Sequence, residues 1–355
     1  MKPRLLAVEL HHLGDAVLSL PFVRAAQKKF DVHVICRPSA VPIYELLSAP
    51  PVIHAWDPPW ADDQPCGLMH AITAALDHGR SFRPMEFTGA VCAWADARVE
   101  ILMASTGAGQ RIGFPMTRGN YYAADLPWRR ARRWLGRTLE IFWRVWNRGQ
   151  SALTHPLHRE SSRQPHLRCW EQIAAALGHA CDYSVPWIRV SDADQPVPDQ
   201  RPVLAVHAHA RLPSKQWPRE KWRELLSSRV IVGKFDVREI VPPGASPVTS
   251  DPSRQLVTSD LTSLVGALNS ADIVLCHDSL PSHLAAALGK KVVAVFGSGE
   301  PDWFAPWRNR DFVVQKRVCP LHPCIDRCGM DSYLCLEAIR PSDVLSQLVR
   351  REAQP

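Results

Sequence analysis

The sequence has no long hydrophobic run. Its 355 residues contain no apolar stretch that approaches the roughly 18 residues of a membrane-spanning helix. The apolar run at the N-terminus is not a continuous signal-peptide core either, because four polar residues interrupt it: Glu9, His11, His12 and Asp15. We therefore expect a cytoplasmic protein without a transmembrane segment.

Tightly paired C-x2-C cysteines are also missing. The chain has ten cysteines, but a cytoplasmic location argues against a disulfide framework. Four of them follow a C-x4-C-x3-C-x6-C spacing near the C-terminus: Cys319, Cys324, Cys328 and Cys335. Four thiols this close suit a structural Zn²⁺ or iron site, and reduced, partly buried thiols are the alternative.

Acidic residues are scarce in one segment of an already basic chain. The formal net charge of +7 predicts an anionic partner, which leaves phosphorylated glycolipid, a membrane surface and nucleic acid open. Residues 128–148 contain seven arginines and four tryptophans but only one acid, Glu140. We expect this segment to contact phosphorylated lipid headgroups through four arginines: Arg129, Arg130, Arg132 and Arg133. A surface helix with buried tryptophans is the alternative.

Short apolar runs alternate with helical patterns along the whole chain. We expect strands at residues 4–10, 32–36, 87–94, 110–114, 203–207, 230–233, 272–276 and 291–296. We expect helices at residues 16–29, 166–177, 219–226, 261–271 and 341–350. We expect another helix after the run 87–94 to about residue 105, and one that starts after Asp278-Ser279 and continues through residues 284–288. This alternation is typical of doubly wound α/β domains. The polar, proline-containing segment 191–201 is a candidate linker, which predicts an N-terminal domain at 1–190, a C-terminal domain at 202–340 and a terminal helix at 341–355.

The stretch 271–297 predicts a binding site. It combines a buried strand, a turn, a helix and a second buried strand, so that Asp278, Ser279 and His283 gather where the first strand ends. Open α/β sheets bind ligands at this edge, and a helix N-terminus favours phosphate. An ordinary capped helix is the alternative interpretation.

Three segments in this order resemble the lipopolysaccharide heptosyltransferases, glycosyltransferase family 9. They are Gly14-Asp15 followed by Pro21, the S-K-x-W-P pattern at 214–218, and the pattern D-S-x-x-x-H-L-A-A-A-L-G at 278–289. Residues 111–114 resemble a fourth segment of the family. The resemblance implies a GT-B architecture, in which two Rossmann-like domains face a central cleft.

The resemblance also implies an activity. It implies inverting transfer of a heptose from ADP-heptose to a lipopolysaccharide core acceptor, without a metal in catalysis. The enzyme would be peripheral at the inner face of the inner membrane. The N-terminal half would bind the acceptor, with Gly14 beside it, and Asp15 would be the general base. From the sequence, Asp15 could instead cap the helix at 16–29.

The donor half carries the remaining candidate residues. Lys215 and the helix N-terminus after Asp278 would stabilise the departing diphosphate. Asp278 would also hold hydroxyls of the donor sugar, and Ser279 would add a hydroxyl donor. His283 faces the diphosphate or simply packs against its neighbours.

Two departures from the family pattern leave the donor open. Leu280 stands where the family has glycine, and His209-Ala210-Arg211-Leu212 replaces a small hydroxyl-bearing loop. Arg211 could take over phosphate contacts, and Asp236 is a candidate for the ribose hydroxyls. The alternatives are another sugar nucleotide, O-heptosylation of a protein, or a degenerate member that only binds glycolipid.

Overall fold

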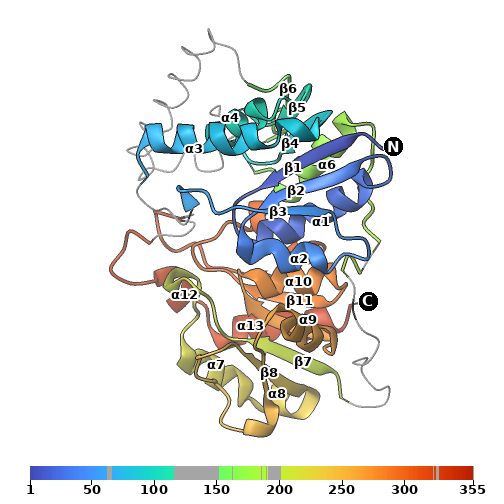
Figure 1. Cartoon of the computed structure of the whole chain (residues 1–355). Helices are drawn as coiled ribbons and strands as arrows, with labels where there is room; N and C mark the ends of the chain where they lie inside the picture. The colour runs from blue at the N-terminus through green and yellow to red at the C-terminus, as the bar shows by residue number, and fades with distance from the viewer. Residues whose placement is uncertain are drawn as a thin grey trace. The chain divides into compact units, whose positions relative to one another are not determined.

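The protein divides into two compact units. The computed structural model describes residues 1–61, 66–115, 152–161, 163–184, 186–188, 190, 201–322, 324 and 328–354. Unit 1 is Met1–Ser184 and unit 2 is Val185–Pro355, and each contains one sheet (Figure 1). Within these described ranges, no helix is both long and apolar enough to cross a membrane.

The sheet of unit 1 is parallel and has the strand order β3-β2-β1-β4-β5-β6. Its strands are β1 (Arg4–Glu9), β2 (Asp31–Cys36), β3 (Val52–Ala55), β4 (Gly89–Cys92), β5 (Gln110–Gly113) and β6 (His155–Pro156). This is the order of a dinucleotide-binding sheet, in which the winding direction reverses between β1 and β4. Side chains that follow these two strands therefore meet at one edge.

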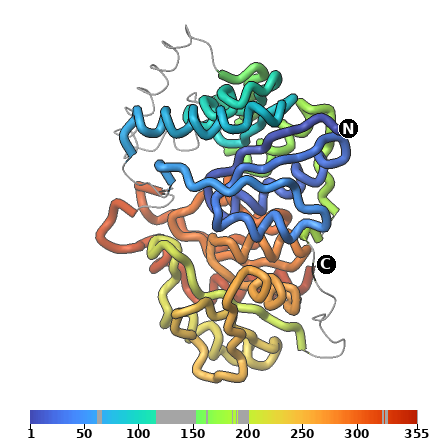
Figure 2. The backbone as a smooth tube through the Cα atoms, viewed as in Figure 1, coloured from blue at the N-terminus to red at the C-terminus, as the bar shows by residue number. Residues whose placement is uncertain are grey.

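Helices of unit 1 form two groups. They are α1 (Leu13–Ala26), α2 (Val41–Glu45), α3 (Leu68–Ser81), α4 (Ala97–Ser105) and α6 (His166–Ala176). α3 packs on α4, while α1 packs on α2 and α6 (Figure 2). Leu6 and Val8 of β1 share a buried apolar cluster with residues of α3 and α4. Apolar side chains on both faces explain why the strands read as continuous hydrophobic runs.

Unit 2 repeats the same topology with the order β12-β11-β10-β7-β8-β9. Its strands are β7 (Val203–His207), β8 (Asp236–Val241), β9 (Gln255–Val257), β10 (Ile273–His277), β11 (Lys291–Val295) and β12 (Val313–Val314). All are parallel, and the winding reverses between β7 and β10. The predicted α/β class with two doubly wound sheets is therefore confirmed.

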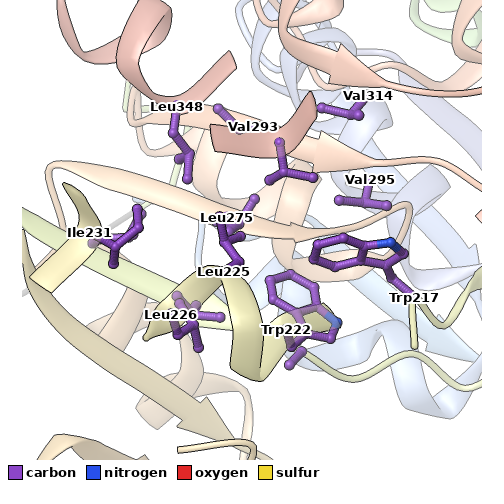
Figure 3. Close-up of a cluster of buried hydrophobic side chains, with 14 of the residues drawn as sticks. Trp217, Trp222, Leu225, Leu226, Ile231, Leu275, Val293, Val295, Val314 and Leu348 are labelled. Carbon is purple, nitrogen blue, oxygen red and sulfur yellow. The ribbon is translucent and has the colours of Figure 1, made fainter. Parts of the chain in front are cut away.

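The helices of unit 2 cover its sheet. They are α7 (Arg219–Leu226), α8 (Arg229–Lys234), α9 (Leu261–Asn269), α10 (Leu280–Ala287), α11 (Pro301–Phe304), α12 (Leu334–Glu337) and α13 (Pro341–Glu352). Trp217 and Trp222 pack edge to face at 5.0 Å between ring centroids, among Leu275, Val295 and Leu348 (Figure 3). The Trp217 indole N–H donates to the carbonyl of residue 339 at 3.1 Å. This cluster joins the segment after β7 to β10, β11 and α13.

The predicted elements agree with the structure except in two places. Residues 230–233, predicted as a strand, lie in α8, because the Ser228 hydroxyl caps a helix there by accepting from the Ile231 N–H. The strand follows as β8 instead. α1 begins at Leu13, three residues before the predicted start. The predicted linker, apart from Arg201, and the basic segment 128–148 lie outside the described residues.

Candidate functional site

The carboxyl end of β10 forms the strand–turn–helix junction that the sequence predicts. β10 ends at His277, and Ser279 is the N-cap residue of α10, with Pro281 in the first turn. The Ser279 side chain makes no capping bond, and its hydroxyl donates to the His277 carbonyl at 3.3 Å. α10 closes before Gly289, whose φ of +78° suits a residue without a side chain.

An ion pair crosses the point where the winding of unit 2 reverses. Lys215 lies in a short 3₁₀ turn, Pro213–Lys215, after β7, and its Nζ is 3.0 Å from Asp278 Oδ2. The Asp278 side chain is 5% exposed and the Lys215 side chain 20%. The carboxylate is thus almost fully buried, whereas the lysine side chain is still partly exposed to solvent. In doubly wound sheets, ligands bind at this reversal point.

Two glycines after β11 bring the chain close to this pair. A side chain on Gly299 would overlap the Asp278 carboxylate, and one on Gly297 would overlap the backbone of Ser214. The Ser298 N–H donates to the Ser214 carbonyl at 3.2 Å, which ties this loop to the turn that carries Lys215. Only glycine permits so close an approach. Our sequence interpretation missed both glycines, although a G-x-G pattern at a strand end was the available signal.

Two buried histidines flank the ion pair. His277 Nε2 accepts a hydrogen bond from the Trp217 backbone N–H at 2.9 Å, and burial lowers the pKa of His277 to about 3. Burial also lowers the pKa of His283 to about 4, with the charges of Asp278 and Lys215 acting in opposite directions. His283 is therefore neutral at pH 7 and lies within electrostatic reach of the pair. Its Nδ1 is buried without a hydrogen-bond partner in the described part of the chain.

Asp236, predicted to contact the ribose, lies at the wrong edge of the sheet. It is the first residue of β8, aligned with Val203 at the start of β7, and it pairs with Arg238 at 2.9 Å. Glu239 stands nearer the binding edge, aligned with Val206. Its buried carboxylate accepts from the N–H groups of residues 248 and 249 at 2.7 Å each, so it holds that loop. Arg211 is exposed.

In unit 1, Asp15 lies at the corresponding sheet edge. It is in the first turn of α1, after Gly14, and it is 5% exposed. Its Oδ2 accepts from the His12 N–H at 3.1 Å, so Asp15 does stabilise the helix start, though from the third helical position and not as the N-cap. Burial and the nearby charge of Glu9 raise the pKa of Asp15 from 3.8 to about 6. A carboxylate with this pKa suits general-base chemistry near neutral pH.

An aromatic stack joins the ends of β1 and β4 beside Asp15. The His11 ring stacks on Trp94 at 4.2 Å, and the Trp94 ring lies 4.4 Å from His166. Asp96 and Arg98 form a two-point ion pair beside the stack, with the shorter contact at 2.7 Å. Our sequence interpretation identified none of these side chains as site residues, since they come from three separate parts of the chain.

The four C-terminal cysteines lie within electrostatic reach of one another. Burial and, to a smaller extent, the other three thiols raise the pKa of Cys324 to about 11: Cys328, Cys319 and Cys335. All four are free thiols. Among the residues described, no group of three or more His, Cys, Asp or Glu is arranged so that it could hold a metal ion. As placed, the thiols do not fit an ion without a local rearrangement.

The predicted acceptor arginines cannot be located in the same way. Arg129, Arg130, Arg132 and Arg133 lie outside the described residues.

Sequence comparisons identify a family domain in unit 2. Residues 255–333 match the model of glycosyltransferase family 9 (heptosyltransferase). Lipooligosaccharide heptosyltransferase 2 of Campylobacter jejuni is 29% identical over 77 residues. That match spans 21% of this chain and 24% of the relative, so it covers about a quarter of the relative's length.

Solved structures resemble the whole chain. Escherichia coli heptosyltransferase WaaC with ADP gives a TM-score of 0.65 at 15% identity, over 98% of this chain and 99% of that chain. E. coli ADP-heptose lipopolysaccharide heptosyltransferase II gives 0.62 at 16% identity, over 99% and 98%. The iron-containing dodecameric glycosyltransferase TibC of enterotoxigenic E. coli gives 0.51 at 15%, over 99% and 76%. Residues 255–333 thus match the model of glycosyltransferase family 9, and the whole chain shares the GT-B fold of the solved heptosyltransferases.

Proposed function

We propose that this protein is an inverting glycosyltransferase that moves a heptose from ADP-heptose to a lipopolysaccharide core acceptor. The observation that carries the proposal is the Lys215–Asp278 pair at the reversal point of unit 2, at the start of α10. Solved relatives with the same fold were crystallised with ADP and with ADP-2-deoxy-2-fluoro heptose. A nucleoside diphosphate is the ligand that such a site favours.

On the donor side, the groups of unit 2 would stabilise the leaving diphosphate. The Lys215 ammonium supplies a positive charge, and the N-terminus of α10 adds the positive end of its dipole. Asp278 holds Lys215 in place before the donor arrives and offers a carboxylate to the sugar hydroxyls. His283 is neutral, so it would contribute a hydrogen bond and no charge. Preorganised groups of this kind contribute about 3 kcal/mol each.

On the acceptor side, Asp15 would act as the base. Its ionised carboxylate takes the proton of the acceptor hydroxyl while that oxygen forms a bond to the anomeric carbon of the donor. The bond from this carbon to the diphosphate oxygen breaks in the same step, and the diphosphate leaves with the electron pair. A single displacement of this kind inverts the anomeric configuration.

Calorimetry with several nucleotides tests the donor. ADP is expected to bind more tightly than GDP or UDP, and ADP-heptose more tightly than ADP-glucose. Tighter binding of GDP or UDP would instead support another sugar nucleotide, which Leu280 and the loop at 209–212 left open. No detectable nucleotide binding would support a glycolipid-binding protein without transferase activity. A protein acceptor would leave the donor result unchanged and would appear as heptose attached to protein in a lysate.

We also propose that the four C-terminal cysteines bind a structural Zn²⁺ or iron ion. Cys319, Cys328 and Cys335 lie within electrostatic reach of Cys324, and the relative TibC is described as iron-containing. An ion would have to draw the thiols closer together, because the described residues form no group that could hold a metal as they are placed. Metal binding would also release the protons of the thiols. Reduced protein purified without a chelator is expected to carry about one Zn or Fe per chain. Metal analysis that finds none would leave four free thiols.

The basic segment 128–148 is our proposed membrane contact. Each arginine near an anionic surface contributes about 1 kcal/mol, and this contribution falls with salt. The variant for this test replaces four arginines with glutamine: Arg129, Arg130, Arg132 and Arg133. It is expected to co-sediment less with anionic vesicles and to bind ADP with unchanged affinity. If the wild-type protein co-sediments with vesicles equally at low and high salt, this role is contradicted.

A further inference from the structure

Two buried carboxylates flank the turn between β1 and α1. Glu9, the last residue of β1, is 2% exposed, and Asp15 is 5% exposed. The His11 N–H donates to Glu9 Oε1 at 3.1 Å, and the next N–H, that of His12, donates to Asp15 Oδ2 at 3.1 Å. Consecutive peptide groups thus hold both carboxylates beside one another at the same sheet edge.

Two imidazoles lie close to the Glu9 carboxylate. His11 Nδ1 lies 3.7 Å from Glu9 Oε1, and His166 Nε2 lies 3.9 Å from Glu9 Oε2. Burial lowers the pKa of His11 and lowers that of His166 to about 4, so both rings are neutral at pH 7. In the described part of the chain, Glu9 forms no ion pair with lysine or arginine.

Several elements bring titratable and charged groups toward Asp15. α1 packs against β1, β2, α2, α6 and the 3₁₀ turn Pro38–Ala40. The titratable groups facing the site from these elements and from the turn are Glu9, Cys36, Tyr44, His166, His11 and His12. Arg37 pairs with Asp57 at 2.9 Å, and Arg98 pairs with Asp96 at 2.7 Å. Among the charges that act on Asp15, Glu9 has the largest effect and raises its pKa, whereas His12 and His11 lower it.

We propose that Glu9 is a positioning residue whose negative charge makes Asp15 a stronger base than an isolated aspartate. The pKa of Asp15, raised to about 6, agrees with this role, because burial is its largest cause and Glu9 the second. The catalytic part of the inference rests on the proposed role of Asp15. A base whose pKa approaches the working pH takes a proton more effectively in the transition state.

The test is a titration of Asp15 in wild-type protein and in Glu9→Gln, followed by ¹³C NMR of carboxyl-labelled aspartate. Asp15→Asn identifies the signal by its disappearance. The glutamine side chain keeps an oxygen for the His11 N–H, so it removes the charge and retains the turn. The midpoint of Asp15 is expected near pH 6 in wild-type protein and at lower pH in Glu9→Gln. An unchanged midpoint overturns the proposal.

Two further variants separate charge from structure. Glu100→Gln removes another buried carboxylate of unit 1 that does not act on Asp15, so the midpoint is expected to stay near 6. Glu9→Asp keeps the charge and is expected to retain most of the shift. If Glu9→Gln does not fold, the wild-type titration remains a test, because a midpoint near pH 4 overturns the proposal.

The pH dependence of transfer gives the catalytic readout. The acidic limb of the pH profile of kcat/KM is expected to shift to lower pH in Glu9→Gln, together with the NMR midpoint. Loss of transfer in Asp15→Asn, with an unchanged midpoint in Glu9→Gln, overturns the role of Glu9 alone. A near-normal rate in Asp15→Asn overturns the proposed base and with it the catalytic part of this inference.

Discussion

Asp15→Asn is expected to lower the rate of sugar transfer by about 10²–10⁴-fold while leaving ADP affinity nearly unchanged. The amide cannot take a proton from the acceptor hydroxyl, but its oxygen can still accept from the His12 N–H that Asp15 holds at 3.1 Å. The helix start is therefore preserved. The measurement is the single-turnover rate at saturating donor, with calorimetry for ADP. Near-normal transfer would remove Asp15 from the mechanism.

Asp343 provides a matched control for the capping role. It also lies at the third position of a helix, α13, where its carboxylate accepts from the Arg340 N–H at 2.9 Å. Asp343→Asn should leave transfer unchanged. If Asp343→Asn lowers the rate as much as Asp15→Asn, weakening of a helix start would explain both results.

Stability measurements separate loss of the base from loss of the fold. The pKa of Asp15 is about 6 in the folded protein and ordinarily 3.8, so between these values the folded state binds more protons than the unfolded state. Asp15 thus lowers stability as pH rises through this window, and the full cost, on the order of 3 kcal/mol, is present above pH 6. Asp15→Asn is therefore expected to be at least as stable as wild type at pH 8, as measured by urea unfolding.

Lys215→Ala is expected to weaken ADP binding by about 10- to 150-fold. One charge-assisted contact with the diphosphate is worth roughly 1.5–3 kcal/mol. The loss should lie toward the upper end, because the variant also leaves the buried Asp278 carboxylate without its cation at 3.0 Å, next to the phosphates. Calorimetric titration with ADP measures the change. An unchanged dissociation constant would refute the assignment of Lys215.

Lys234 provides the matched control for this change. It pairs with Glu352 at 3.0 Å and precedes β8, at the sheet edge opposite Lys215. Lys234→Ala should leave ADP affinity unchanged. A comparable loss in both variants would mean that the net charge of the protein governs ADP binding. The difference between each variant and wild type would then disappear at high salt.

The amino-acid sequence predicted most elements of both sheets. β7 and α7 have the predicted bounds, and β10 differs by one residue at each end. Continuous apolar runs, proline at 281 and glycine at 289 are local signals, so they act on the backbone within a few residues. The prediction of a strand at residues 230–233 was wrong, because a short apolar run suits a strand or a helix. The Ser228 cap favours the helix.

Several site residues could be predicted as chemical types but not as partners. Asp15, Lys215 and Asp278 were identified through motifs, and the sequence also predicted that they follow strands. It did not predict that Asp236 would lie at the far edge, because that depends on where β8 begins. Had the strand been predicted at 236–241, Glu239 would have replaced Asp236 as the edge residue.

The local sequence by itself therefore determined which segments become strands and helices, and which reactive side chains stand at strand ends. The tertiary structure alone decided which of these side chains meet. Lys215 reaches Asp278, and Gly299 lies against the same carboxylate, because parallel strands β7, β10 and β11 end at one edge. Glu9 acts on Asp15 because both are buried beside one turn, where little water screens their charges. Such effects depend on distance and burial, which a linear sequence does not contain.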